Sequence, residues 1–188
     1  DMVGSHLANY NFIVNLAHFK GHAMGGFGGV LKNMSIGIAS AMGKSLIHSA
    51  GKETTGFGID TPQDDFLESM AEAAKAVADY RNGSILYINV MNHLSVDCDC
   101  DSHPAPPEMN DIGIFASLDP VALDQACVDA CLAAAPMPGS QLARNMAKKD
   151  FVDHHDHFRN STPESEWKSC LEHAEKIGLG SREYTLIK

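Results

Sequence analysis

Short apolar runs alternate along the chain with segments whose apolar residues recur at helical spacing. The three runs lie at residues 12–17, 85–90 and 112–116. Nearly continuous apolar runs of this length are typical of buried strands. A cap residue followed by proline predicts that helices begin at Thr61, Asp119 and Thr162. Strands that alternate with helices predict a single α/β domain over residues 1–188, with a mainly parallel sheet flanked by helices.

The segments between these elements are rich in glycine or in polar residues. A glycine-dense turn at residues 25–29 precedes small and apolar residues from 30 to 42, which predict a buried helix weakened by Gly37. Glycines and hydroxyl residues over 44–58 predict a loop. The polar stretch 148–161 predicts a solvated connection.

Functional side chains follow each predicted strand at the point where the strand ends. They are His18, Lys20 and His22 after the first strand, Asn92, His93 and residues 97–103 after the second, and Ser117 and Asp119 after the third. The carboxyl ends of parallel strands meet at one edge of a sheet, where α/β proteins bind ligands. The pattern therefore predicts one polar site at the carboxyl ends of the strands. The alternative is that the polar residues only mark surface loops.

The net charge of the chain disfavours some kinds of binding partner. The 188 residues include 24 acidic and 14 basic side chains, for a formal net charge of −10 with the histidines neutral. Such an acidic chain disfavours nucleic acid and anionic membranes as partners. No apolar run approaches the roughly 18 residues of a membrane helix, and the five cysteines are too sparse for a disulfide framework. Without a signal-peptide profile, these features predict a cytoplasmic protein.

The most specific candidate for metal binding is the pair Cys98 and Cys100. In extended backbone, residues two apart face the same way, so both sulfurs can bind one ion. Three aspartates flank the pair, and their negative charge raises the thiol pKa values unless a cation is bound. The sequence thus predicts either a site for a divalent transition metal, Fe or Zn, completed by His18 or His22, or a pair of unreactive thiols.

A second candidate is the segment that follows the first strand. His18 and His22 are predicted to move protons or to bind metal, and Lys20 to hold an anionic group in the same catalytic site. Glycines allow the backbone to approach a ligand, and a helix that begins near residue 29 would point N–H groups at an anion. The predicted ligand-binding glycines are Gly26, Gly28 and Gly29. The alternative is a loop with two solvated imidazoles.

Other polar and sulfur-bearing residues have structural interpretations. Cys127, Cys131 and Cys170 fall on apolar helix faces and are predicted to fill the core. Asp119 is predicted to cap a helix. Asp124, about one turn further on, is predicted to be either solvated or turned toward the site.

Several motifs make the chain similar to the DUF362 proteins, often labelled uncharacterised iron–sulfur centre proteins. The motifs are His18-Phe19-Lys20-Gly21-His22, Gly26-Phe27-Gly28-Gly29, Leu31-Lys32-Asn33, Ala41-Met42-Gly43-Lys44, Cys98-Asp99-Cys100, Asp119-Pro120-Val121-Ala122, Asp124-Gln125-Ala126 and residues 177–184. They extend over nearly the whole chain. The resemblance implies that one site includes the histidine and cysteine segments together with Lys32, Asn33, Lys44, Asp119 and Asp124.

Two departures from the family pattern bear on cofactors and domains. Many members carry a ferredoxin-like insert with paired cysteine motifs for iron–sulfur clusters, and the corresponding interval between Lys44 and Phe66 contains no cysteine. The resemblance therefore implies that this chain holds no such clusters, and that a ferredoxin-type partner or a missing domain would supply them. The family's N-terminal half is also missing, so we expect the chain to be the C-terminal portion of a longer protein.

These observations lead to three hypotheses about function. In the first, the two cysteines and a histidine bind the metal, while Lys20, Lys32 and Lys44 hold a small anionic molecule. Its reaction class, redox or lyase-type, stays open, and so does the oligomeric state. In the second, the chain is a non-enzymatic electron-transfer or scaffold accessory of iron–sulfur chemistry. The third is a binding module for a small anion, without metal or turnover.

Overall fold

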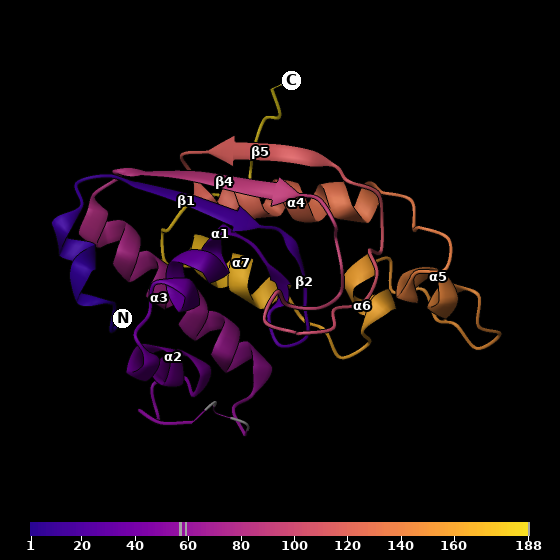
Figure 1. Ribbon diagram of the computed structural model, residues 1–188, viewed down its shortest axis with the longest axis horizontal. Coiled ribbons are helices and arrows are strands. Elements are labelled where there is room, and N and C mark those ends of the chain that lie inside the picture. The colour runs from indigo at the N-terminus through magenta and orange to yellow at the C-terminus, as the bar shows by residue number, and fades with distance from the viewer. Residues whose placement is uncertain (57, 59, 188) are drawn as a thin grey trace.

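The computed structural model describes residues 1–56, 58 and 60–187, which form a small sheet with helices packed on one side of it (Figure 1). In chain order the elements are the 3-10 helix η1 (Ser5–Asn9), strands β1 (Ile13–His18), β2 (Lys20–His22) and β3 (Gly26–Gly28), helix α1 (Val30–Lys32), the π-helical segment η2 (Asn33–Gly37), helices α2 (Ala41–His48) and α3 (Gln63–Arg81), strands β4 (Ile85–Met91) and β5 (Gly113–Ser117), and helices α4 (Pro120–Ala133), α5 (Gln141–Met146), α6 (His157–Ser161) and α7 (Lys168–Lys176). This set of elements confirms the predicted mixture of helices and strands.

The direction of β5 differs from the predicted one. β1 and β4 are parallel neighbours, with His18 opposite Val90, whereas β5 runs antiparallel to β4 and places Ser117 opposite Tyr87. The three-stranded sheet is thus mixed, and the prediction of a mainly parallel sheet is wrong. A parallel crossover usually carries a helix. Residues 92–112, which connect β4 to β5, contain none and return the chain in the opposite direction.

This reversal separates the end of the third strand from the ends of the other two. His18 at the end of β1 and Asn92 just after β4 lie at one edge of the sheet. Ser117 ends β5 near the start of β4, at the opposite edge. The expected convergence of all three strand ends therefore does not occur, because Ser117 and Asp119 lie at the other edge.

The two faces of the sheet have different surroundings. Tyr87 and Met91 point to the face that α4 covers and are buried there. On the opposite face, Val14, Leu16 and Ile114 are more than half exposed. In the described structure the sheet is therefore covered on one face, whereas the apolar runs predict strands buried on both.

The two longest helices begin where the proline signals predict. α4 follows Asp119, whose side chain accepts hydrogen bonds from the backbone N–H groups of Val121 and Ala122. α3 begins directly after Pro62 and ends at Asn82, which adopts the left-handed conformation at φ 47°. Both helices begin within two residues of the predicted positions. The cap expected from Thr61 is wrong, because the N-cap of α3 is Pro62 and no side chain caps this helix.

Other boundaries differ from those predicted. Residues 30–42 contain α1, η2 and the start of α2 in place of one helix, and α2 extends to His48 into the predicted loop. The π-helical segment ends at Gly37, a residue with low helix propensity. The last helix begins after Trp167 instead of at Thr162, because Thr162 forms the C-cap of α6.

Candidate functional site

A polar cleft opens at the end of β1, between the β3–α1 turn, helix α2 and the loop that follows β4. Its volume is about 320 Å³. The charged and amide-bearing residues in its lining are His18, Lys20, Lys32, Asn33, Lys44 and Asp99. With Gly28 and Gly29, the structure thus brings together seven of the predicted site residues. From the sequence, Asp99 is only a charge next to the cysteines, because nothing there indicates where its side chain points.

Asp99 ties the loop after β4 to the end of β1. Its Oδ1 lies 2.7 Å from His18 Nδ1, and its Oδ2 accepts a hydrogen bond from Lys20 Nζ at 2.7 Å. The other His18 nitrogen, Nε2, lies 2.7 Å from the Asn92 carbonyl oxygen. Both ring partners are oxygen acceptors, so each contact is a hydrogen bond when the ring nitrogen carries a proton. Burial raises the pKa of Asp99, but the hydrogen bonds from Lys20 and His18 outweigh it and hold the pKa below its usual value.

His22 lies in a different environment, in which its ring is neutral. Nδ1 accepts hydrogen bonds from the backbone N–H groups of Met24 at 3.2 Å and Gly25 at 3.0 Å, so the ring proton is on Nε2. Burial and the nearby charges of Lys32 and Lys20 lower the pKa of His22 to about 3. A metal bound at Nε2 would need the proton to move to Nδ1, with loss of both backbone hydrogen bonds.

Cys98 and Cys100 lie in a turn and not in extended backbone. The Asp101 N–H group donates to the Cys98 carbonyl oxygen at 2.9 Å, and the Cys100 N–H group donates to Cys98 Sγ at 3.4 Å. Lys32 Nζ lies 3.8 Å from the same sulfur. Burial raises the pKa of the Cys98 thiol, but the hydrogen bonds from Cys100 and the charges of Lys32 and Lys20 outweigh it, so the pKa is lowered.

The flanking aspartates therefore do not act on both thiols as expected. The pKa of Cys100 is raised, chiefly by its hydrogen bond to Cys98, whereas that of Cys98 is lowered. The expectation is wrong for Cys98 because Asp99 turns toward Lys20 and His18, and Lys32 lies next to the sulfur. The other three cysteines are buried as predicted, namely Cys127, Cys131 and Cys170.

Lys32, Asn33 and Lys44 reach the cleft from the helical segments that follow the glycine turn. Asn33 Nδ2 donates to Asn15 Oδ1 at 2.7 Å and to the Leu16 carbonyl oxygen at 3.2 Å, so this amide braces β1. No carboxylate of the described residues lies within ion-pair distance of Lys32 or Lys44. Their two positive charges are therefore not neutralised by an ion pair in the described structure.

The three predicted glycines have different surroundings. Gly28 and Gly29 line the cleft. A Cβ atom at Gly29 would overlap the carboxylate of Asp124, which packs directly behind the turn. Gly26 lies outside the cleft lining, at φ 71° and against Trp167. Gly26 therefore allows the turn and the close approach of Trp167 at the start of α7. Its ligand-binding role stays a prediction.

The two predicted aspartates near the start of α4 bind backbone groups and do not line the cleft. Asp124 is fully buried and accepts hydrogen bonds from the N–H groups of Val30 at 3.0 Å and Leu31 at 2.9 Å, and from Asn89 Nδ2 at 2.7 Å. Burial raises the pKa of Asp124 to about 6. Asp119 caps α4 as predicted. The ligand-binding role of both carboxylates stays a prediction.

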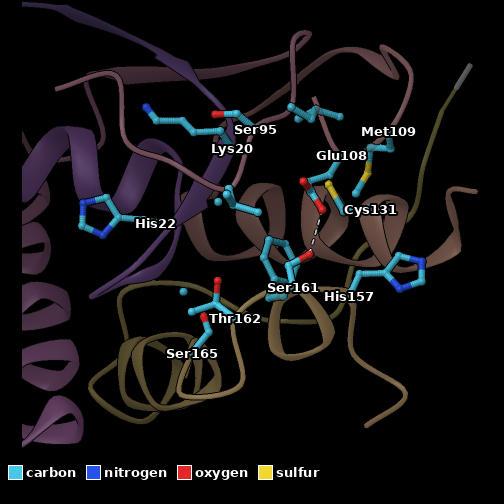
Figure 2. Close-up of a pocket in the computed structure, with 15 residues that line it drawn as sticks. Lys20, His22, Ser95, Glu108, Met109, Cys131, His157, Ser161, Thr162 and Ser165 are labelled. Atoms are coloured by element: carbon cyan, nitrogen blue, oxygen red, sulfur yellow. Dashed lines mark hydrogen bonds between the residues drawn. The ribbon is translucent and has the colours of Figure 1, made fainter. Parts of the chain in front are cut away.

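A second, smaller cavity borders β2 and α6. Figure 2 shows Lys20 and His22 at the edge of this cavity, with their side chains turned away from its centre. Ser161 Oγ donates a hydrogen bond to Glu108 Oε2 at 2.9 Å. Glu108 also accepts hydrogen bonds from the first turn of α5. With a volume of about 30 Å³, the cavity has room for about one water molecule. No sequence motif indicates this role for Glu108, since a single acidic residue in a proline-rich loop forms no motif.

The structure does not assemble the expected metal ligands. Within residues 1–56, 58 and 60–187, no group of three or more His, Cys, Asp or Glu side chains is arranged to hold a metal ion. The Fe or Zn site at Cys98 and Cys100 with His18 or His22 stays a prediction.

Comparisons with known proteins place the chain in a family without naming an activity. No helix in the described part of the chain is long and apolar enough to cross a membrane. Searches of curated proteins and of solved structures found no match. The profile of the family described as "Domain of unknown function (DUF362)" matches residues 1–129, which include the cleft residues and the cysteine pair but not residues 177–184. Because this match covers more than half of its length, the chain belongs to the DUF362 family.

Proposed function

We propose that the cleft at the end of β1 binds a small anionic molecule, a carboxylate or a phosphate. The observation that carries the proposal is the position of Lys32 and Lys44, which line one cleft without a carboxylate partner among the described residues. The chain as a whole has a net charge of −10, so this local excess of positive charge is an exception. A cleft with unneutralised cations attracts and concentrates anions.

The contacts in the cleft support a ligand that bridges separate elements. Lys32 comes from α1 and Lys44 from α2, so an anion between them would join the two helices. Lys20 is buried and fixed by its bonds to Asp99 at 2.7 Å and to the His18 carbonyl oxygen at 3.1 Å. The volume of about 320 Å³ lies near the lower end of the range for small-molecule sites, which supports a ligand of few atoms.

Binding is the part of the predicted function that these contacts support. A redox or lyase-type reaction with His18, Lys20 and His22 as catalytic groups stays a prediction. The same holds for an accessory role in iron–sulfur chemistry with a ferredoxin-type partner.

Calorimetric titration with inorganic phosphate and with citrate tests the proposal. We expect at least one of the two anions to bind, and we expect Lys32→Gln and Lys44→Gln each to weaken binding about tenfold or more. The reason is that a hydrogen bond to a charged group contributes about 1.5 kcal/mol or more, and 1.4 kcal/mol corresponds to a factor of about ten. Comparing phosphate with citrate identifies which class of anion the cleft prefers.

Lys149→Gln is the matched control, because it removes one lysine outside the cleft lining. It should bind the anion with the affinity of the unmodified chain. Circular dichroism should show that all three variants are folded. Equal affinities in all four proteins, or no binding of either anion, would contradict the proposal.

A further inference from the structure

We propose that Cys98 and Cys100 form a redox-active thiol pair that reduces small anionic disulfides beside the cleft. The pair itself is argued from the contacts of the two sulfurs in the loop after β4. The preference for an anionic disulfide rests on the anion-binding function proposed above.

The turn at residues 98–101 brings the two sulfurs within reach of each other. The hydrogen bond from the Asp101 N–H group to the Cys98 carbonyl oxygen, at 2.9 Å, closes the turn. The Cys100 backbone N–H group donates to Cys98 Sγ at 3.4 Å, so the second residue of the pair lies against the first sulfur. A turn shortens the separation of residues i and i+2 relative to extended backbone, and a disulfide needs Cα atoms within about 7 Å. A disulfide between Cys98 and Cys100 is therefore compatible with this turn.

The surroundings of Cys98 suit the attacking sulfur. Lys32 Nζ lies 3.8 Å from Cys98 Sγ, and the Cys100 backbone N–H group donates to the same atom at 3.4 Å. Both contacts stabilise negative charge on the sulfur, and the thiolate is the form that attacks a disulfide. Cys98 is partly exposed and Cys100 is exposed, so a small reagent can reach the first sulfur and the second can follow.

The residue between the two cysteines holds the pair next to the cleft. The Asp99 side chain is bonded to His18 and Lys20 on the cleft wall. Lys32 lines the cleft and also contacts Cys98 Sγ. An anionic group bound at Lys32 therefore lies beside the attacking sulfur. This shared ammonium group is the reason to expect a disulfide that carries carboxylates.

The reaction is a two-step thiol–disulfide exchange. The Cys98 thiolate attacks one sulfur of the disulfide R–S–S–R, which breaks the S–S bond, forms a mixed disulfide and releases one R–S⁻. The Cys100 sulfur then attacks Cys98 Sγ, its proton passes to a released thiolate, and the second R–S⁻ leaves. Two electrons pass from the protein dithiol to the small disulfide, which becomes one thiol and one thiolate, and the thiolate takes up from water the proton that Cys98 had released. The protein gains the Cys98–Cys100 bond.

Incubation of the reduced, EDTA-treated chain with oxidised glutathione, followed by mass spectrometry, tests the proposal. We expect the chain to lose the mass of two hydrogens and the new bond to map to Cys98 and Cys100. Cys100→Ser should instead retain one glutathione adduct at Cys98, whereas Cys98→Ser should react much more slowly. The buried Cys127, Cys131 and Cys170 serve as internal controls and should stay unmodified.

Cystamine, a cationic disulfide, is the matched probe for the anionic preference. Oxidised glutathione should react faster than cystamine, and Lys32→Gln should slow its reaction about fivefold, the effect of one charge about 4 Å away in water. Lys149→Gln should leave the rate unchanged. Equal rates for the two probes would overturn the anionic preference but not the thiol pair.

The two proposals are contradicted by different experimental results. If oxidised glutathione and cystamine both leave Cys98 and Cys100 as free thiols, or if Cys98→Ser and Cys100→Ser react equally fast, the thiol pair is overturned. Phosphate or citrate binding measured by calorimetry does not depend on either sulfur. A chain that binds those anions without forming the disulfide would therefore overturn this inference and leave the anion site standing.

Discussion

The Asp124 carboxylate on α4 lies 2.9 Å from the backbone nitrogen of Leu31, at the start of α1. The same carboxylate accepts hydrogen bonds from Val30 at 3.0 Å and from Asn89 on β4 at 2.7 Å. One buried side chain thus joins two helices and the central strand directly behind the wall of the cleft. The shape of the cleft therefore depends on a residue that does not line it.

Replacing Asp124 with alanine should destabilise the fold strongly. The change leaves three donors in the core without their acceptor, and each unsatisfied buried group costs about 1–3 kcal/mol. We expect the free energy of unfolding, measured with urea, to fall by about 3 kcal/mol or more. The control is Asp79→Ala, which removes an exposed carboxylate paired with Lys75 and should cost less than about 0.5 kcal/mol. Similar losses in the two variants would contradict the role assigned to Asp124.

The ionisation of Asp124 should appear in the pH dependence of stability. Burial raises its pKa from 3.8 to about 6, so between these values the folded state holds a proton that the unfolded state releases. The contribution of Asp124 to stability therefore falls as the pH rises from about 4 to about 6 and is constant above that. We expect the unfolding free energy of the unmodified chain, minus that of Asp124→Asn, to decrease across this window. A difference that does not change with pH would be evidence against the raised pKa.

Gly29 should not tolerate a side chain. Its φ of −137° is open to any residue, but a Cβ atom would overlap the Asp124 carboxylate. Overpacking of a core usually costs about 1–3 kcal/mol, so we expect Gly29→Ala to lower the free energy of unfolding by that amount and to weaken anion binding. Gly4→Ala is the control, because a Cβ atom there meets no atom within 4 Å. Unchanged stability of Gly29→Ala would show that the turn can move away from α4.

The metal hypothesis predicts a difference in elemental composition. Freshly purified chain should contain Fe or Zn, and a Cys98→Ser/Cys100→Ser variant should lose it, because thiolates would supply half of the ligands. Mass-spectrometric elemental analysis measures both proteins. His103→Ala removes a histidine of the same loop that is outside the expected ligand set and should retain the metal. Equal metal content in the unmodified chain and the double variant would rule out the thiolate site.

Several features of the fold follow from residues that are close in the sequence. Pro62 and Asp119 set the starts of α3 and α4 through local geometry and a local cap. The end of α3 at Asn82 is also a local feature, because asparagine tolerates the left-handed conformation that Asn82 adopts. The prediction that the last helix begins at Thr162 is wrong, because Thr162, although followed by proline, ends the preceding helix.

The candidate site likewise combines residues that the sequence indicates with contacts that only the folded chain makes. The sequence pattern indicates Lys20 and the cysteine pair, because clusters of such residues after strands are recognisable along the chain, whereas Lys32 and Lys44 are implied by the family resemblance. It did not identify Asp99 as the residue that ties His18 and Lys20 to the cysteine loop, since these contacts join residues about 80 positions apart. The environment of Cys98 likewise depends on Lys32, which lies 66 positions away in the chain.

The sequence by itself determined where the strands β1, β4 and β5 and the helices α3 and α4 lie, which cysteines are buried, and which basic residues follow the first strand. These properties depend on local periodicity and on caps, which are short-range. Only the tertiary structure decided that β5 is antiparallel, that Asp124 binds backbone N–H groups instead of lining the cleft, and that the Cys98 thiol has a lowered pKa. Each of these depends on contacts between distant segments, and the flanking residues of a segment do not specify its distant partners.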